Sequence, residues 1–117
     1  MNEKDLKQRT KQFALQVVRF CETLPKDETS RILGRQLLRS GTSVGANYRA
    51  VCRVKSNADF TSKFGTVLDE ADESAYWMEL LIEPGKAAHE RADALLTEAN
   101  KLVAISVSSI NTARKAQ

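Results

Sequence analysis

The sequence predicts an all-α protein with the architecture of an antiparallel up-and-down four-helix bundle. Four segments carry apolar residues at the three- and four-residue spacing of amphipathic helices, short breaker or capping segments separate them, and no strand pattern has a partner. A chain of 117 residues is long enough for one domain with its own core. We expect a single domain over residues 1–117, with helices at about 5–23, 27–55, 58–83 and 88–113.

The first helix is expected over residues 5–23. Phe13, Val17 and Phe20 recur on one face at spacings of four and three residues. Pro25 then disfavours continuation of the helix and suits the start of the next one. Because the connection is short, the second helix is expected to run antiparallel to the first.

The second helix, expected over residues 27–55, contains the unusual stretch SGTSVGANYRA. A phosphate-binding loop would need the pattern GxxxxGK[ST] after a strand, and both are missing here. Leu37, Val44 and Tyr48 instead continue one apolar stripe through the stretch at helical spacing. We therefore expect a continuous helix whose glycines allow another helix to approach closely, with a local kink as the alternative.

Charge is distributed unevenly along the chain, although the net charge is only +3. Residues 1–58 carry 12 Lys/Arg and 5 Asp/Glu, whereas residues 59–117 carry 6 and 10. Such asymmetry suggests either a face that binds a polyanion or the pairing of a basic element with an acidic one.

Five arginines fall in one arc of the second helix, on a different side from the apolar stripe. The planar guanidinium group favours bidentate contacts with carboxylate or phosphate groups. Two interpretations stay open besides simple solvation: ion pairs with carboxylates of the third helix, within a chain or between subunits, and contacts with nucleic-acid phosphates. The candidate phosphate-binding residues are Arg31, Arg35, Arg39, Arg49 and Arg53, together with Lys7, Lys11 and Lys55.

The third and fourth helices are expected over residues 58–83 and 88–113, with a Pro–Gly pair marking the break between them. Opposite its apolar face the third helix is acidic, and Tyr76 and Trp77 lie toward that side. Interface packing is the favoured interpretation of the two aromatic residues, with base stacking as the alternative. The candidate helix-contact or oligomer-interface residues are Gly34, Gly41, Gly45, Tyr48 and Trp77.

The composition and the scattered reactive residues exclude several kinds of protein. No apolar run approaches the roughly 20 residues of a membrane span, and the polar N-terminal segment lacks the apolar core of a secretory leader. Cys21 and Cys52 are isolated and His89 is the only histidine, so neither a metal site nor a catalytic triad can be assembled. We expect a cytoplasmic protein with no enzymatic activity, no cofactor and no membrane partner.

Two stretches carry a resemblance to a known family: QLLRSGTSVGANYRA (36–50) and DFTSKFGTVLDEADESAYWMELL (59–81). They resemble the ribosomal-RNA intervening-sequence proteins, small four-helix bundles that are similar to the accessory variability determinant of diversity-generating retroelements. The resemblance extends over residues 8–112 and implies a homopentamer with a central channel and no known catalysis. For the retroelement branch it implies binding to nucleic acid and to a reverse transcriptase through basic surface residues.

The sequence thus leads to two hypotheses. The first is a non-enzymatic, oligomeric four-helix-bundle scaffold or adaptor whose basic surface binds RNA or DNA, as an accessory to a reverse transcriptase. The second is a structural or protein-binding ring in which the arginines pair with carboxylates across subunits. A ring needs two different, complementary faces on each subunit, and a basic second helix against an acidic third helix is one such pair.

Overall fold

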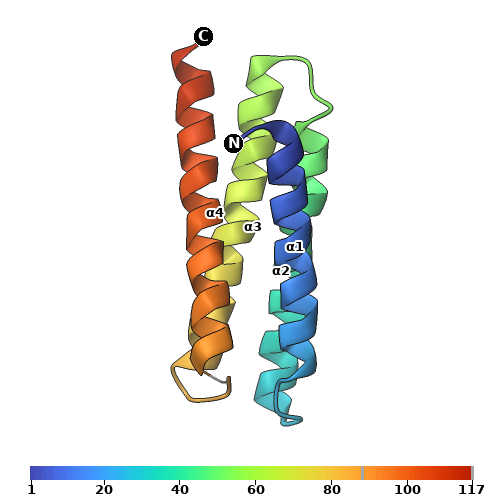
Figure 1. The fold of residues 1–117 in the computed structure, drawn as a ribbon, viewed down its shortest axis with the longest axis vertical. Helices are drawn as coiled ribbons and strands as arrows, with labels where there is room; N and C mark the ends of the chain where they lie inside the picture. Colours follow the sequence, from blue (N-terminus) through green and yellow to red (C-terminus); the bar gives the residue numbers. More distant parts are fainter. Residues whose placement is uncertain (88, 117) are drawn as a thin grey trace.

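The computed structural model describes residues 1–87 and 89–116, without the side chain of His89, and folds them into a four-helix bundle (Figure 1). Consecutive helices run antiparallel, and both termini lie at the same end of the bundle. Within the described residues there is no strand, so the predicted all-α, up-and-down bundle is confirmed. The helices are α1 (Glu3–Glu22), α2 (Glu28–Val51), α3 (Asn57–Ile82) and α4 (His89–Lys115).

Side-chain caps determine where the first three helices begin. Asn2, Asp27 and Ser56 are the N-cap residues, and each accepts a hydrogen bond from the backbone N–H three residues later, at 2.8–3.1 Å. The bond from the Ser30 N–H is the main reason why the pKa of Asp27 lies below its ordinary value. Lys86, in the α3–α4 connection, lies 3.3 Å from the same carboxylate and ties that connection to the start of α2.

The end of α2 differs from the expectation. The helix ends at Val51 and not near residue 55, and the chain continues through turns before α3 begins. The N–H of Arg53 bonds the Ala50 carbonyl at 3.1 Å, which tightens the last turn. Arg53 and Lys55 therefore lie beyond the helix that was expected to carry them. Residue 88, the expected start of the fourth helix, lies outside the described residues.

One hydrophobic core runs along the bundle, and small hydroxyl residues are buried within it. Ser40 on α2 and Ser74 on α3 are both fully buried, and their hydroxyl oxygens lie 2.9 Å apart. Thr10 is also buried and donates to the Leu6 carbonyl at 2.9 Å. Small side chains at these levels let neighbouring helices approach closely, and each hydroxyl has a partner, so its burial costs little.

Glycines allow α2 to pack closely against α1. A Cβ atom placed on Gly41 would lie 2.8 Å from a methyl carbon of Val17, and one on Gly45 would lie 3.2 Å from the Thr10 hydroxyl oxygen. Gly34 faces Leu24 in the same way, at 2.8 Å. The stretch SGTSVGANYRA is therefore a helical segment, and its glycines contact α1 of the same chain.

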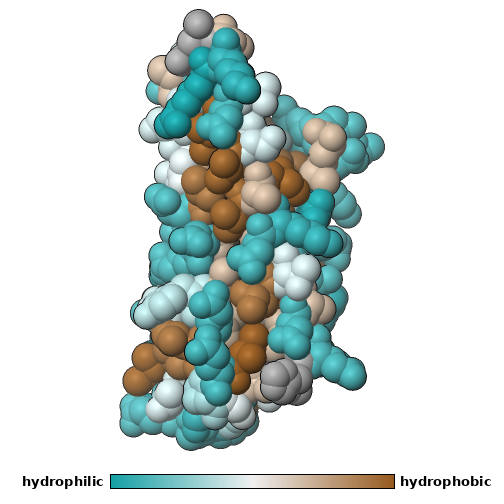
Figure 2. Space-filling view, turned by 90° about the vertical axis from the view of Figure 1, so that its left-hand side faces the viewer, coloured by the Kyte–Doolittle hydropathy of each residue, from teal (hydrophilic) through white to brown (hydrophobic). Residues whose placement is uncertain are grey.

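The outer surface of α4 is partly hydrophobic. Figure 2 shows the side of the molecule on which α4 lies in Figure 1, and hydrophobic side chains reach it in a band that hydrophilic ones interrupt. On α4, Val107 is exposed, while Leu96, Val103 and Ile105 are partly buried. Among the described residues, no helix combines the length and apolar character that crossing a membrane requires.

The α1–α2 contact predicts opposite effects for two glycine-to-alanine substitutions. Gly41→Ala should lower the free energy of unfolding by about 1 kcal/mol or more, because buried Val17 has no room to move away from the new methyl group. Gly65→Ala, in α3, should raise it by about 0.5–1 kcal/mol through helix propensity, since nothing lies within 4 Å of the new Cβ. Urea unfolding curves of both variants measure the difference. An equal gain in stability in both would contradict the close contact.

Candidate nucleic-acid interface

The register of α1 against α2 determines which charges meet on this face. Thr10 lies opposite Gly45 and Val17 opposite Gly41, so the first half of α1 runs alongside the last half of α2. Lys7, one turn before Thr10, and Lys11, next to it, line the outer side of the contact from α1. Arg49 lies in the last turn of α2, and Arg53 follows just beyond the end of that helix. Basic residues that are about 40 positions apart in the sequence are therefore neighbours in the fold.

A groove of about 340 Å³ runs between these two half-helices. Its walls carry four cations, its floor consists of small residues, and no carboxylate lines it. The small floor leaves room for a ligand to approach the helix backbones, with the cations on both sides. We call this site the basic groove, and its lining residues are Lys7, Lys11, Ala14, Thr42, Gly45, Ala46, Arg49 and Arg53.

Most of the charge in the basic groove is available to a ligand. Lys11 and Arg49 are exposed and form no ion pair with any side chain that the structure describes. Lys7 lies 3.6 Å from Glu3, but both side chains are about half exposed or more, at 46% and 60%. An exposed pair of this kind contributes little and is readily exchanged for another partner.

Arg53 also has a structural contact. Its Nη1 donates to the backbone carbonyl of Arg49 at 3.2 Å, near the end of α2. A cation at this position complements the negative end of the helix dipole. The contact uses one terminal nitrogen of the guanidinium group, and the other nitrogens remain available. Arg53 therefore caps the C-terminal end of α2 and also contributes charge to the basic groove.

Arg39 has a different environment from the arginines of the basic groove. Its Nη1 lies 3.4 Å from a carboxylate oxygen of Glu70, and its Nη2 donates to Glu73. Glu73 also accepts a hydrogen bond from the Trp77 indole N–H at 3.1 Å. Arg39 is thus bound to α3 of its own chain, as the ion-pair interpretation of the arginines expects, and its charge is largely neutralised.

The remaining basic candidates lie away from the basic groove. Arg31 pairs with Glu28 at 3.1 Å on the exposed surface of α2. Arg35 is exposed and lies with Arg31 and Lys26 around a second groove, of about 410 Å³, at the α1–α2 connection. Lys55 lies near the start of α3 and lines a groove toward the end of α4. The arginines of α2 therefore have different neighbours along the helix and line different grooves.

The structure adds Thr42 and Lys26 to the residues chosen from the sequence. Thr42 lines the basic groove, and its hydroxyl donates to the Leu38 carbonyl at 2.7 Å, which leaves oxygen lone pairs free. A helical wheel places Thr42 between Arg35 and Arg49, so its position was available from periodicity alone. Lys26 lies in the α1–α2 connection, where no helical periodicity indicates its neighbours.

The two aromatic candidates differ in accessibility. Tyr48 is 6% exposed and packs in the core, with its ring 5.5 Å from that of Phe64. Trp77 is partly buried, and its ring lies 5.2 Å from that of Tyr76, which is 53% exposed. Tyr48 therefore contacts other helices of its own chain, while the Tyr76–Trp77 pair reaches the surface of α3, on a different helix from either wall of the basic groove.

The described residues offer little reactive chemistry. Burial raises the pKa of the Cys21 thiol to about 11, so the thiol stays protonated and is a poor nucleophile at neutral pH. Burial also raises the pKa of Cys52. In the part of the chain that the structure describes, no three His, Cys, Asp or Glu residues come together in a group that could hold a metal ion.

Comparisons with known proteins agree with this architecture. The 23S rRNA-intervening sequence protein family matches residues 2–108. A solved structure of a protein of unknown function from the S23 ribosomal protein family of Bacteroides thetaiotaomicron is similar, with 32% identity and a TM-score of 0.86. The similarity covers 95% of this chain and 99% of that one. No curated protein matches the chain. Because the family match spans almost the whole sequence, the chain belongs to the 23S rRNA-intervening sequence protein family.

Proposed function

We propose that this chain is a non-enzymatic, cytoplasmic scaffold protein that binds the phosphate backbone of RNA or DNA in the basic groove. The observation that carries the proposal is the convergence of four cations, two from α1, one from α2 and one from the turn that follows α2, around a small-residue floor that no carboxylate lines. Phosphate contacts of this kind release condensed counterions, so affinity should fall steeply as salt concentration rises. The family's description names a ribosomal RNA, which makes RNA the first ligand to test.

The composition of the basic groove favours binding that depends little on base sequence. Its lining residues include no aromatic side chain on which a base would stack. Lysine and arginine on rigid helices instead position the phosphates, which carry no sequence information themselves. The resemblance to the accessory variability determinant extends the proposal to a reverse transcriptase as a protein partner, which the bundle would bring to the nucleic acid.

A second candidate function is that of a structural ring, a homopentamer by the resemblance. Two features support this candidate: charged side chains on α3 and α2 without ion-pair partners among the described residues, and hydrophobic surface on the α4 side. Four exposed carboxylates follow one side of α3 and its C-cap and form no ion pair with described side chains: Asp69, Asp72, Glu79 and Glu83. Arg35 offers a complementary charge on α2, and the hydrophobic band on the α4 side (Figure 2) provides apolar area for assembly. Arg39 would take no part, because Glu70 and Glu73 already hold it.

The nucleic-acid proposal predicts a specific change in salt dependence. The double variant Lys11→Gln with Arg49→Gln should bind a fluorescent RNA about tenfold more weakly at low salt. With a single-stranded RNA, its plot of log affinity against log salt should be shallower by about 1.4, from about 0.7 for each lost phosphate contact. Fluorescence anisotropy at several salt concentrations measures both quantities, with DNA of the same sequence in parallel.

The matched control for that experiment removes the same charge from α4. Lys101→Gln with Lys115→Gln changes two exposed lysines outside the basic groove. This control should bind RNA with nearly the affinity and salt slope of the parent protein. Equal losses in the two double variants, or no binding of RNA or DNA by the parent protein at low salt, would contradict the proposal.

The ring proposal predicts a dependence on the α3 carboxylates. Asp72→Asn with Glu79→Gln should lower the mass measured by sedimentation equilibrium toward that of one chain, because the pairs across subunits are lost. Glu22→Gln with Glu90→Gln removes the same charge from α1 and α4 and should leave the mass unchanged. A parent protein that sediments as a monomer at every concentration would rule out the ring.

A further inference from the structure

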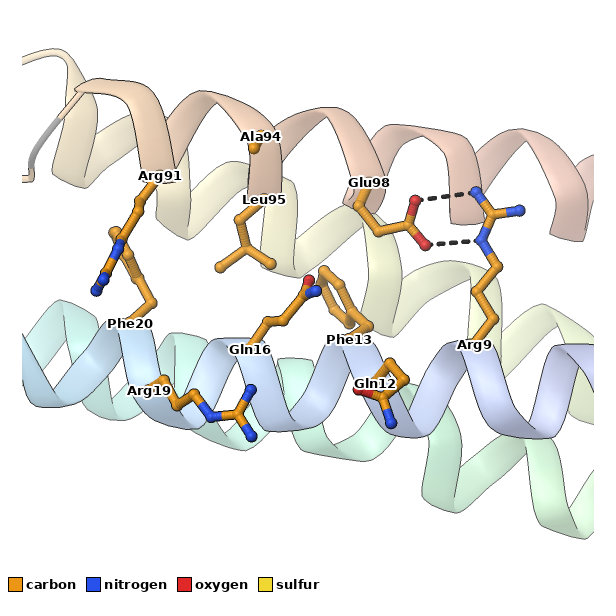
Figure 3. A pocket seen from close by; sticks show the side chains of 10 residues that line it. All are labelled: Arg9, Gln12, Phe13, Gln16, Arg19, Phe20, Arg91, Ala94, Leu95 and Glu98. Atoms are coloured by element: carbon orange, nitrogen blue, oxygen red, sulfur yellow. Dashed lines mark hydrogen bonds and ion pairs between the residues drawn. The ribbon is translucent and has the colours of Figure 1, made fainter.

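Another groove, of about 580 Å³, lies between α1 and α4 (Figure 3). Its floor consists of hydrophobic side chains, with Phe13 and Phe20 from α1 and Leu95 from α4. Toward α4 the α1 helix presents Gln16, whose amide lies between the two helices. The space between α1 and α4 stays open at this level because Gln16 and Ala94, and not large apolar side chains, line it. We call this site the seam groove.

One end of the seam groove is closed by an ion pair. Arg9 on α1 binds Glu98 on α4 through two hydrogen bonds, of 2.7 and 2.9 Å. Glu98 raises the pKa of Arg9, and the pair is largely neutral as a unit. Because this ion pair joins α1 to α4 at the end of the groove, a long ligand such as a peptide helix or strand could not extend past it. The seam groove is therefore a short, closed-ended site.

The other end of the seam groove is cationic. Figure 3 shows Arg91 reaching from α4 toward α1 beside Phe20, while Arg19 lies along α1 at the outer edge. Neither arginine forms an ion pair with any side chain that the structure describes. Three arginines thus line one groove, and only Arg9 has a carboxylate partner in it.

We propose that the seam groove binds a small amphipathic anion. The carboxylate or other anionic head pairs with Arg91, and the apolar body lies over the floor between Arg91 and the Arg9–Glu98 bridge. The volume falls in the range of about 300–1,000 Å³ that is typical of small-molecule sites, and such sites combine a mainly apolar lining with a few polar groups. Gln16 adds an amide that can bond a polar group on the ligand.

The seam groove is separate from the basic groove. The two share no lining residue, because one lies between α1 and α4 and the other between α1 and α2. Binding of an anionic amphiphile therefore does not depend on the proposed nucleic-acid function, and variants of the two sites should act independently.

The test compares three probes that separate charge from apolar area. Decanoate has both, decanol has the same chain without the charge, and acetate has the charge without the chain. Calorimetric titration below the micelle concentration should show binding of decanoate, binding of decanol weaker by about tenfold or more, and no measurable binding of acetate. Decanol binding as tightly as decanoate, or no decanoate binding, would overturn the proposal.

Two variants and a control locate the site. Arg91→Gln should weaken decanoate binding by about tenfold, as expected for the loss of one charge-assisted hydrogen bond. Ala94→Phe should abolish binding, because Ala94 lines the seam groove and a larger side chain would occupy it. Lys101→Gln changes an exposed residue of α4 that does not line the groove, and this variant should bind like the parent protein. Unchanged binding in Arg91→Gln and in Ala94→Phe, with the helical circular dichroism retained, would overturn the assignment.

Discussion

The close contact between α1 and α2 is the constraint on which the rest of the structure depends. Gly41 and Gly45 leave no side chain between the helices, so Val17 and Thr10 pack directly against the α2 backbone. Dispersion and burial at such a contact are sensitive to shifts of less than an ångström. The contact therefore determines the register of the two helices, and the register places the lysines of α1 beside the arginines of α2. The basic groove follows from packing as much as from charge.

On its other side, α2 contacts α3 through hydrogen bonds and ion pairs. Ser40 and Ser74 meet in the core, and Arg39 extends over the surface to Glu70 and Glu73. The arginines of α2 thus have two physical roles that depend on which neighbour they face. Arg39, beside α3, pairs with carboxylates, whereas Arg49, beside α1, lies near other cations. Like charges held together are unfavourable unless a ligand neutralises them, so the basic groove is the place where a polyanion would contribute most.

The sequence was sufficient for the fold but only partly sufficient for the site. Helical periodicity and caps indicated four helices, because the apolar stripe of an amphipathic helix can be recognised in the sequence without knowing which element it packs against. The end of α2 was not visible, since no Gly or Pro follows Val51 in the next few residues. Ser56, with extended backbone angles of φ −95° and ψ 151°, is the N-cap of α3, but no residue type in the sequence marks the turn that follows Val51. A helical wheel also places Arg39 and Arg49 on the same face of α2. Only the structure shows that Arg39 is next to α3 and Arg49 is next to α1.

In this structure, packing of α1 on α2 creates the proposed polyanion site, which neither helix has alone. The most direct measurement is a titration of the isotope-labelled protein with a short RNA at low salt, followed by backbone amide NMR. We expect the shifts to concentrate at residues 7–14 and 42–53, around the basic groove. Shifts confined to α3 and α4, or spread evenly over the surface, would contradict it.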